Sequence, residues 1–154
     1  MSLVTDRTFP PSISTSEKDI QYLSRRRTIA YSPTINIMSV SIVPISDVFQ
    51  AKTEDQLITV FVEIGDGQSG SYSIFLGTDL LGQNSSALLG TKADLKNKKT
   101  VVSVTIIDEL EETNWTSVTV TITEGSSPTI YGPYSREVAA QHDTIIYVLT
   151  LAHH

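Results

Sequence analysis

The side chains that could do chemistry in this 154-residue chain are few and scattered. His142 is the only histidine away from the C-terminal pair, and it is followed by Asp143. A serine hydrolase needs such a base within hydrogen-bond reach of its nucleophile. The chain has no Gly-x-Ser-x-Gly elbow to present that nucleophile. We therefore interpret His142 as a solvated loop residue and predict no catalytic residue.

Carboxylates gather in two links between apolar segments. Two carboxylates across a cleft, about 5–10 Å apart, can hydrolyse a glycosidic bond, and oxygen-rich loops can bind calcium. Neither link has the spacing of an EF-hand loop, so solubilising turns are the simpler interpretation. We predict no metal and no cofactor, and a hydrolase that uses loop carboxylates stays an alternative. The first link carries Glu63 and Asp66, and the second carries Asp108, Glu109, Glu111 and Glu112.

Three aromatic residues could form a ligand platform. Trp115 is the only tryptophan, and its parity places it opposite the apolar side of its predicted strand. Tyr131 and Tyr134 could add two further rings. Aromatic faces stack on sugars, which suggests a carbohydrate-binding module. The alternative is that Trp115 closes the end of the core, as buried tryptophans often do.

Three consecutive arginines, Arg25, Arg26 and Arg27, end a segment that has the features of a short helix over residues 16–27. Acidic residues early and basic residues late in a helix complement its dipole. The alternative is an interaction arm, residues 1–34, that docks on an acidic partner or a neighbouring subunit. Pro10-Pro11 and a surrounding rich in serine and threonine favour a flexible arm.

Composition excludes several classes of protein. The net charge of -6 argues against nucleic acid as a partner, because a nucleic-acid binder needs a basic face. The absence of cysteine excludes disulfides, thiolate metal sites and thiol nucleophiles. No apolar run approaches the roughly 20 residues of a membrane helix, so no membrane span is expected. The compartment is not predicted.

From residue 35 onward, apolar and polar residues alternate with period two, which predicts strands. The Asp66-Gly67 step and the acidic link after residue 107 predict two β-hairpins, over 57–77 and over 100–123. Gly132-Pro133 predicts a turn, Pro44 predicts an edge strand or the end of a strand, and the apolar last strand is expected to be central. The predicted strands are 35–43, 57–64, the segment of Tyr72, Ile74 and Leu76, 86–91, 100–108, 115–123, 129–131 and 143–151.

Strands at this spacing, with almost no helix, predict one all-β domain over residues 35–152. We expect an antiparallel two-sheet sandwich of about 7–8 strands, with a closed barrel as the alternative. The spacing is similar to the broad immunoglobulin-like and fibronectin-type architectures. The likeness is architectural, since the chain lacks a Cys…Trp…Cys framework.

These features favour a non-enzymatic β-sandwich module for protein–protein interaction or self-assembly. The arm, or the edge strands of the sheets, would supply the contact. A carbohydrate-binding module and a hydrolase are the two alternatives.

Overall fold

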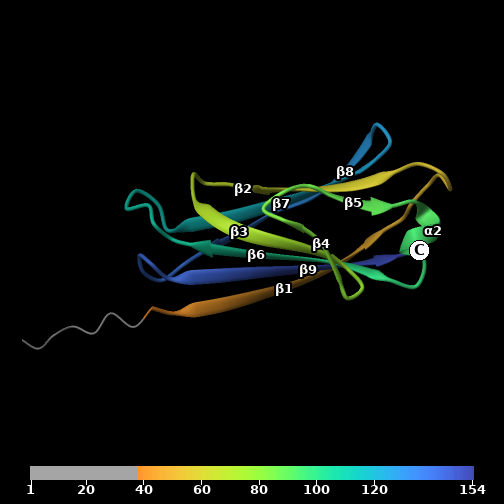
Figure 1. Ribbon diagram of the computed structural model, residues 1–154. Coiled ribbons are helices and arrows are strands. Elements are labelled where there is room, and N and C mark those ends of the chain that lie inside the picture. The colour runs from red at the N-terminus through yellow and green to blue at the C-terminus, as the bar shows by residue number, and fades with distance from the viewer. Residues whose placement is uncertain (1–37) are drawn as a thin grey trace, which may run out of the picture. The chain divides into compact units, whose positions relative to one another are not determined.

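The computed structural model describes residues 38–154, and these residues form a β-sandwich (Figure 1). All described strands belong to one compact unit. The described residues contain nine strands, where about 7–8 were predicted, and the added strand is β4. The elements are β1 (Val40–Phe49), β2 (Ile58–Ile64), β3 (Ser69–Leu76), β4 (Asp79–Gln83), β5 (Ala87–Gly90), α2 (Lys92–Leu95), β6 (Lys99–Ile107), β7 (Trp115–Glu124), β8 (Ser127–Glu137) and β9 (Thr144–His153).

Two sheets form the layers of the sandwich. Sheet A has the strand order β1-β9-β6-β3-β4, and sheet B has the order β5-β2-β7-β8. Figure 1 shows β1, β9 and β6 in one layer and β2, β5 and β7 in the other. Only β1 and β9 run parallel, and every other described pair is antiparallel. The predicted all-β sandwich is therefore confirmed.

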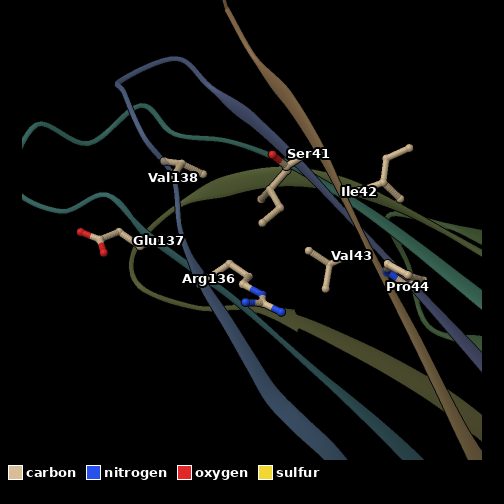
Figure 2. Close-up of a pocket in the computed structure, with 8 residues that line it drawn as sticks. Ser41, Ile42, Val43, Pro44, Arg136, Glu137 and Val138 are labelled. Atoms are coloured by element: carbon tan, nitrogen blue, oxygen red, sulfur yellow. The ribbon is translucent and has the colours of Figure 1, made fainter.

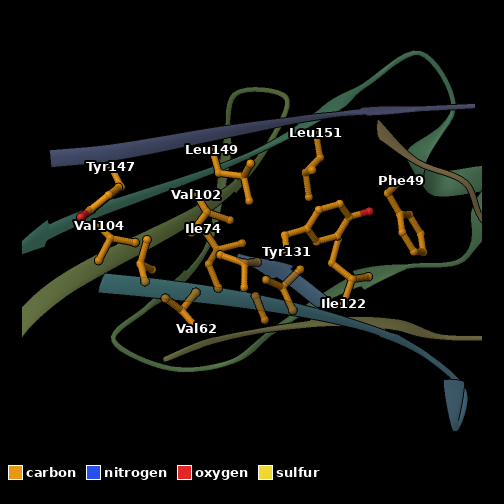
Figure 3. Packing of buried hydrophobic residues seen from close by; sticks show 14 of the residues in the cluster. Phe49, Val62, Ile74, Val102, Val104, Ile122, Tyr131, Tyr147, Leu149 and Leu151 are labelled. Atoms are coloured by element: carbon orange, nitrogen blue, oxygen red, sulfur yellow. The ribbon is translucent and has the colours of Figure 1, made fainter. Parts of the chain in front are cut away.

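The core lies between the sheets and follows the predicted alternation. Ile58, Val60 and Val62 of β2 are buried, whereas the residues between them are exposed. β6 and β7 repeat this pattern, since side chains alternate between the two sides of a strand. Figure 3 shows aliphatic side chains from both sheets meeting in this layer. Burial of these side chains is the main source of the sandwich's stability.

The two predicted hairpins are wrong. β2 belongs to sheet B and β3 to sheet A, so the turn at Asp66-Gly67 carries the chain from one sheet to the other. The φ angles of 57° and 71° at these two residues agree with the predicted reversal. The acidic link makes the same kind of crossing between β6 and β7. A short link can span either two paired strands or the roughly 10 Å between packed sheets, so the turn residues alone do not determine the pairing.

One further prediction, the turn at Gly132-Pro133, is wrong. Gly132-Pro133 lies inside β8 and does not end it. β8 is an edge strand with an irregular register against Val118 and Val120, and an edge tolerates proline because its outer N–H needs no partner. Pro44 does lie on an edge strand, β1, and the last strand, β9, is central, as predicted.

A buried polar contact joins the two sheets. The Tyr147 hydroxyl of β9 lies 2.9 Å from the hydroxyl of Thr116 on β7, and it donates to the Thr116 carbonyl at 2.9 Å. The Thr116 hydroxyl also lies 3.1 Å from the carbonyl of Arg136 on β8. Both Tyr147 and Thr116 are buried. Directional bonds inside an apolar layer set the position of one sheet relative to the other.

The short helix α2 was not predicted. The Thr91 N–H and hydroxyl both donate to the Asp94 carboxylate, at 2.8 and 2.9 Å, and fix its first turn. Leu95 then enters the core. The predicted helix over residues 16–27 and the predicted arm over 1–34 lie outside the described residues. The domain boundary at residues 34 and 35 therefore stays a prediction.

Candidate interaction surface

The outward side of sheet A is a broad surface with almost no charge. Its side chains alternate with the buried ones along the strands, and Lys99 is the only charged residue among them. We call this surface face A. By strand register it consists of Val40, Ile42, Pro44, Ser46 and Val48; Thr144, Ile146, Val148, Thr150 and Ala152; Lys99, Val101, Ser103, Thr105 and Ile107; Ser69, Ser71, Ser73 and Phe75; and Leu80 and Gln83.

Apolar side chains of face A are open to solvent. Val40 and Ile42 on β1 are 63% and 65% exposed. Ile146 and Val148 on β9 are partly covered, since each lies between two neighbouring strands. An antiparallel sheet that faces water on one side normally carries polar residues there. Face A mixes serine and threonine with valine, isoleucine and phenylalanine and has a single charged residue, so about half of its side chains are apolar, as in a protein interface.

None of the acidic residues in the described part of the chain occupies an outward position of face A. The described residues hold fourteen acidic and six basic side chains. The acidic ones lie in the connecting links, at or near strand ends and on sheet B. Face A is therefore an uncharged surface on a strongly negative unit. Depletion of charge is what distinguishes the centre of a protein interface from ordinary surface.

The free edge of β1 is partly closed to further strands. The Ser39 carbonyl accepts from the Thr144 N–H and the Phe49 carbonyl from the His154 N–H, so the odd-numbered residues of β1 direct their backbone groups toward β9. The even-numbered residues between them direct their N–H and C=O groups to the free edge. Pro44 is one of these and has no N–H to offer. Val48 is another: its N–H donates to the Asp47 carboxylate at 2.8 Å, and its carbonyl accepts from the Tyr131 hydroxyl at 3.0 Å. Only a short stretch around Ile42 stays open.

The other sheet edges are also poor templates for strand addition. β5 has four residues and an irregular register against β2, and β4 has five residues and an irregular register against β3. β8 contains Pro128 and Pro133 and an irregular register. Short strands, bulges and prolines protect edges from pairing with another chain. Association through face A is therefore favoured over association through an edge.

A groove of about 470 Å³ lies between the edge strands β1 and β8 (Figure 2). Ser41, Val43 and Pro44 line one side, and Arg136 and Glu137 line the other. In Figure 2 the Arg136 side chain extends toward Val43. The groove presents one cation and one carboxylate together with apolar carbons. This mixture selects no particular charge of ligand.

The structure does not bring the three predicted platform aromatics to one exposed face. Tyr131 is 6% exposed and belongs to the core, and burial raises the pKa of its hydroxyl to about 12. Tyr134 is partly buried against the same core, which also raises its pKa. Trp115 is 48% exposed at the start of β7. Of the three rings, Trp115 is therefore the one open to a ligand.

The acidic link and the His142 turn meet through backbone contacts. The His142 N–H donates to the Asp108 carbonyl at 2.7 Å, and the Asp108 N–H donates to the Asp143 carbonyl at 3.0 Å. Both carboxylates are buried. The Ser39 N–H, 2.8 Å from the Asp143 carboxylate, holds the pKa of Asp143 below its usual range. The arrangement fixes the loops and presents no nucleophile beside a base.

Gln68 is the partner of the second buried carboxylate. Its side-chain nitrogen donates to one oxygen of Asp108 at 2.5 Å, and its side-chain oxygen accepts from the Glu109 N–H at 3.2 Å. The other carboxylate oxygen of Asp108 is buried without a partner among the described residues. Within residues 38–154, no group of three or more histidine and acidic side chains is placed to bind a metal. Sequence reasoning missed Gln68, because no local pattern links it to a residue forty positions away.

A second hollow, of about 450 Å³, lies beside α2 at the end of β9. His153 lines it and bonds the Thr100 hydroxyl through Nε2 at 2.8 Å. Nδ1 of His153 is buried without a partner, and burial lowers the pKa of the ring. Lys92 and Glu54 form an ion pair of 2.7 Å at the rim. The basic groups here are therefore partly neutralised by the protein itself.

The predicted arm residues Arg25, Arg26 and Arg27 lie outside the described residues. Face A was only partly visible in the sequence. The last strand was expected to be apolar on both sides, and its outward side is the part of face A that this sequence feature anticipated. Its neighbour β1 has no charge at its outward positions and β6 has only Lys99, but the strand order that joins these strands is not a local property.

In the described part of the chain, no helix is long and apolar enough to cross a membrane. Comparison with protein-family models, with curated proteins and with solved structures gives no match, so the geometry of face A carries the functional argument.

Proposed function

We propose that this chain is a non-enzymatic β-sandwich module that binds protein through face A. The observation that carries the proposal is a five-stranded sheet face on which Lys99 is the only charge. Exposed valine and isoleucine side chains gain free energy when they leave water, by roughly 25 cal/mol per Å² of apolar surface. The proposed likeness to immunoglobulin-like and fibronectin-type architectures agrees with this role and rests on the two-sheet layering alone.

The size of face A supports the same function. Five strands about 4.8 Å apart, with up to ten residues of about 3.3 Å each, give a face of roughly 700 Å². A specific interface covers on the order of 800 Å² on each partner. Face A is thus as large as one side of an ordinary protein–protein contact. The protected edges add to the argument, since they oppose association by addition of a strand.

Photo-crosslinking of the full chain tests the proposal. Benzoylphenylalanine is placed at Ile42 on face A or, as a matched control, at Ile130 on the outward side of sheet B. The two side chains are 65% and 63% exposed, and both lie on edge strands. A protein adduct at position 42 but not at position 130, in the cells that produce the chain, is expected. No adduct at position 42, or equal adducts at both positions, would refute the proposal.

The exposed ring of Trp115 supports a second candidate, carbohydrate binding. Since Trp115 is the only tryptophan, its fluorescence reports on that position alone. Stacking of a sugar on the ring changes its emission. A titration with a panel of oligosaccharides is expected to quench or shift the emission if this candidate is right. An unchanged spectrum across the panel removes the reason for it.

A further inference from the structure

We infer that the partner of face A is a second copy of this chain, which packs face to face through the five strands of sheet A. The inference rests on the proposed function and names its partner. In the dimer, the outward side of one sheet A covers the outward side of the other, about 10 Å away, as in the aligned packing of two sheets. The dimer would bury roughly 1,400 Å² in total, within the range of stable specific interfaces.

Charge is the first argument for a second copy. The described unit has fourteen acidic and six basic side chains, so two copies repel each other wherever acidic links approach. Face A is the broad surface where this repulsion is absent. Packing through face A leaves the acidic links at the periphery, in water. A basic partner would instead be attracted to those acidic links.

The single charge of face A is the second argument. Lys99 is the first residue of β6, and Glu109 lies two residues after the end of the same strand, where its carboxylate accepts a hydrogen bond from the Ser69 hydroxyl at 3.0 Å. A two-fold axis in the plane of the face and across the strands lays β6 antiparallel over the β6 of the partner. Lys99 of each copy then lies over the end of the strand that carries Glu109 in the other. The same surface thus complements itself, as a two-fold interface requires.

The closed edges are the third argument. Pro44, the Val48 contacts and the bulges of β4, β5 and β8 oppose the continuation of either sheet into a neighbouring molecule. Association by face packing closes after two copies, whereas association by edges can continue into a fibre. The protected edges and the open face together fit a dimer.

Light scattering of the purified full chain over a concentration series tests the inference. The monomer mass is 16.9 kDa. We expect the dimer, at twice this value, for the unmodified chain and for Ile130→Glu. Ile42→Glu places one carboxylate from each copy in the buried interface, and we expect the dissociation constant of the dimer to rise on the order of 100-fold. Far-ultraviolet circular dichroism and Trp115 emission confirm that both variants are folded.

A monomeric unmodified chain, or a dimer equally stable in both variants, would overturn the inference. These outcomes are distinguishable from failure of the proposed function. If position 42 crosslinks to a protein of another mass while the purified chain is monomeric, face A binds a different partner. If position 42 crosslinks to nothing, the interaction role itself fails.

Discussion

The contact between Tyr147 and Thr116 makes a quantitative prediction about stability. Tyr147→Phe removes one hydroxyl, which takes part in two bonds of 2.9 Å between sheet A and sheet B. The ring stays, so the apolar packing is preserved. A lost hydrogen bond costs about 1 kcal/mol, and a buried acceptor left without its donor adds about 1 kcal/mol. We expect the free energy of unfolding to fall by about 2 kcal/mol.

Urea denaturation measures this difference. Trp115 precedes Thr116 on β7, so its fluorescence reports on the strand that loses the contact. With a slope of about 2 kcal/mol per molar urea, the midpoint is expected to fall by about 1 M. The melting temperature is expected to fall by about 4–8 °C. Circular dichroism should give the same transition, which tests two-state behaviour.

A double-mutant cycle with Thr116→Val separates the contact from other effects of each substitution. The Thr116 hydroxyl also lies 3.1 Å from the Arg136 carbonyl, so Thr116→Val has a cost of its own. Because Tyr147 and Thr116 contact each other directly, we expect a coupling energy of about 0.5–1 kcal/mol. A loss below about 0.5 kcal/mol in Tyr147→Phe, or strict additivity in the cycle, would refute the reasoning.

Three further predictions follow from buried contacts. The backbone N–H of Lys52, 2.9 Å from the carboxylate of Glu124, lowers the pKa of that carboxylate. The ionised Glu124 therefore stabilises the fold above the unfolded-state pKa near 4.5, and this stabilisation is lost as the pH falls through the folded-state pKa. Glu124→Gln should unfold in less urea than the unmodified chain at pH 7 and should match it in strong acid. Burial lowers the pKa of His153, so the stability that the neutral ring contributes is complete above pH 6.5 and declines as the pH falls below it. The melting temperature of His153→Gln should therefore change less between pH 8 and pH 5 than that of the unmodified chain. A Cβ on Gly70 would overlap the Thr105 backbone carbonyl, so Gly70→Ala should cost at least about 1 kcal/mol, and an unchanged melting temperature would contradict this.

Much of the local structure could be predicted from residue types. The alternation at Val118, Val120 and Ile122 predicted both a strand and its buried side, and the structure places all three in the core. Period-two patterning works because successive side chains of a strand point to opposite sides. Helix α2 could also have been predicted, since Thr91 and Asp94 have the spacing of an N-terminal cap.

The partners of each strand could not be predicted in the same way. The links after Ile64 and after Ile107 contain turn residues that suit a hairpin, yet both cross between sheets. A turn determines where the chain reverses, whereas the pairing depends on which strands fill each sheet. The same limit applies to Tyr131, because no local pattern indicates that its hydroxyl donates to the Val48 carbonyl of β1.

The sequence by itself determined that the part of the chain which the structure describes is mostly strand, which residues of most strands are buried, and that β9 is apolar on both sides. Only the tertiary structure decided that the outward positions of β1, β9, β6 and β3, where Lys99 is the single charge, form one continuous face. The physical reason is that residue type acts locally, through side-chain burial and backbone conformation. Face A exists only because strands distant in the sequence are hydrogen-bonded side by side.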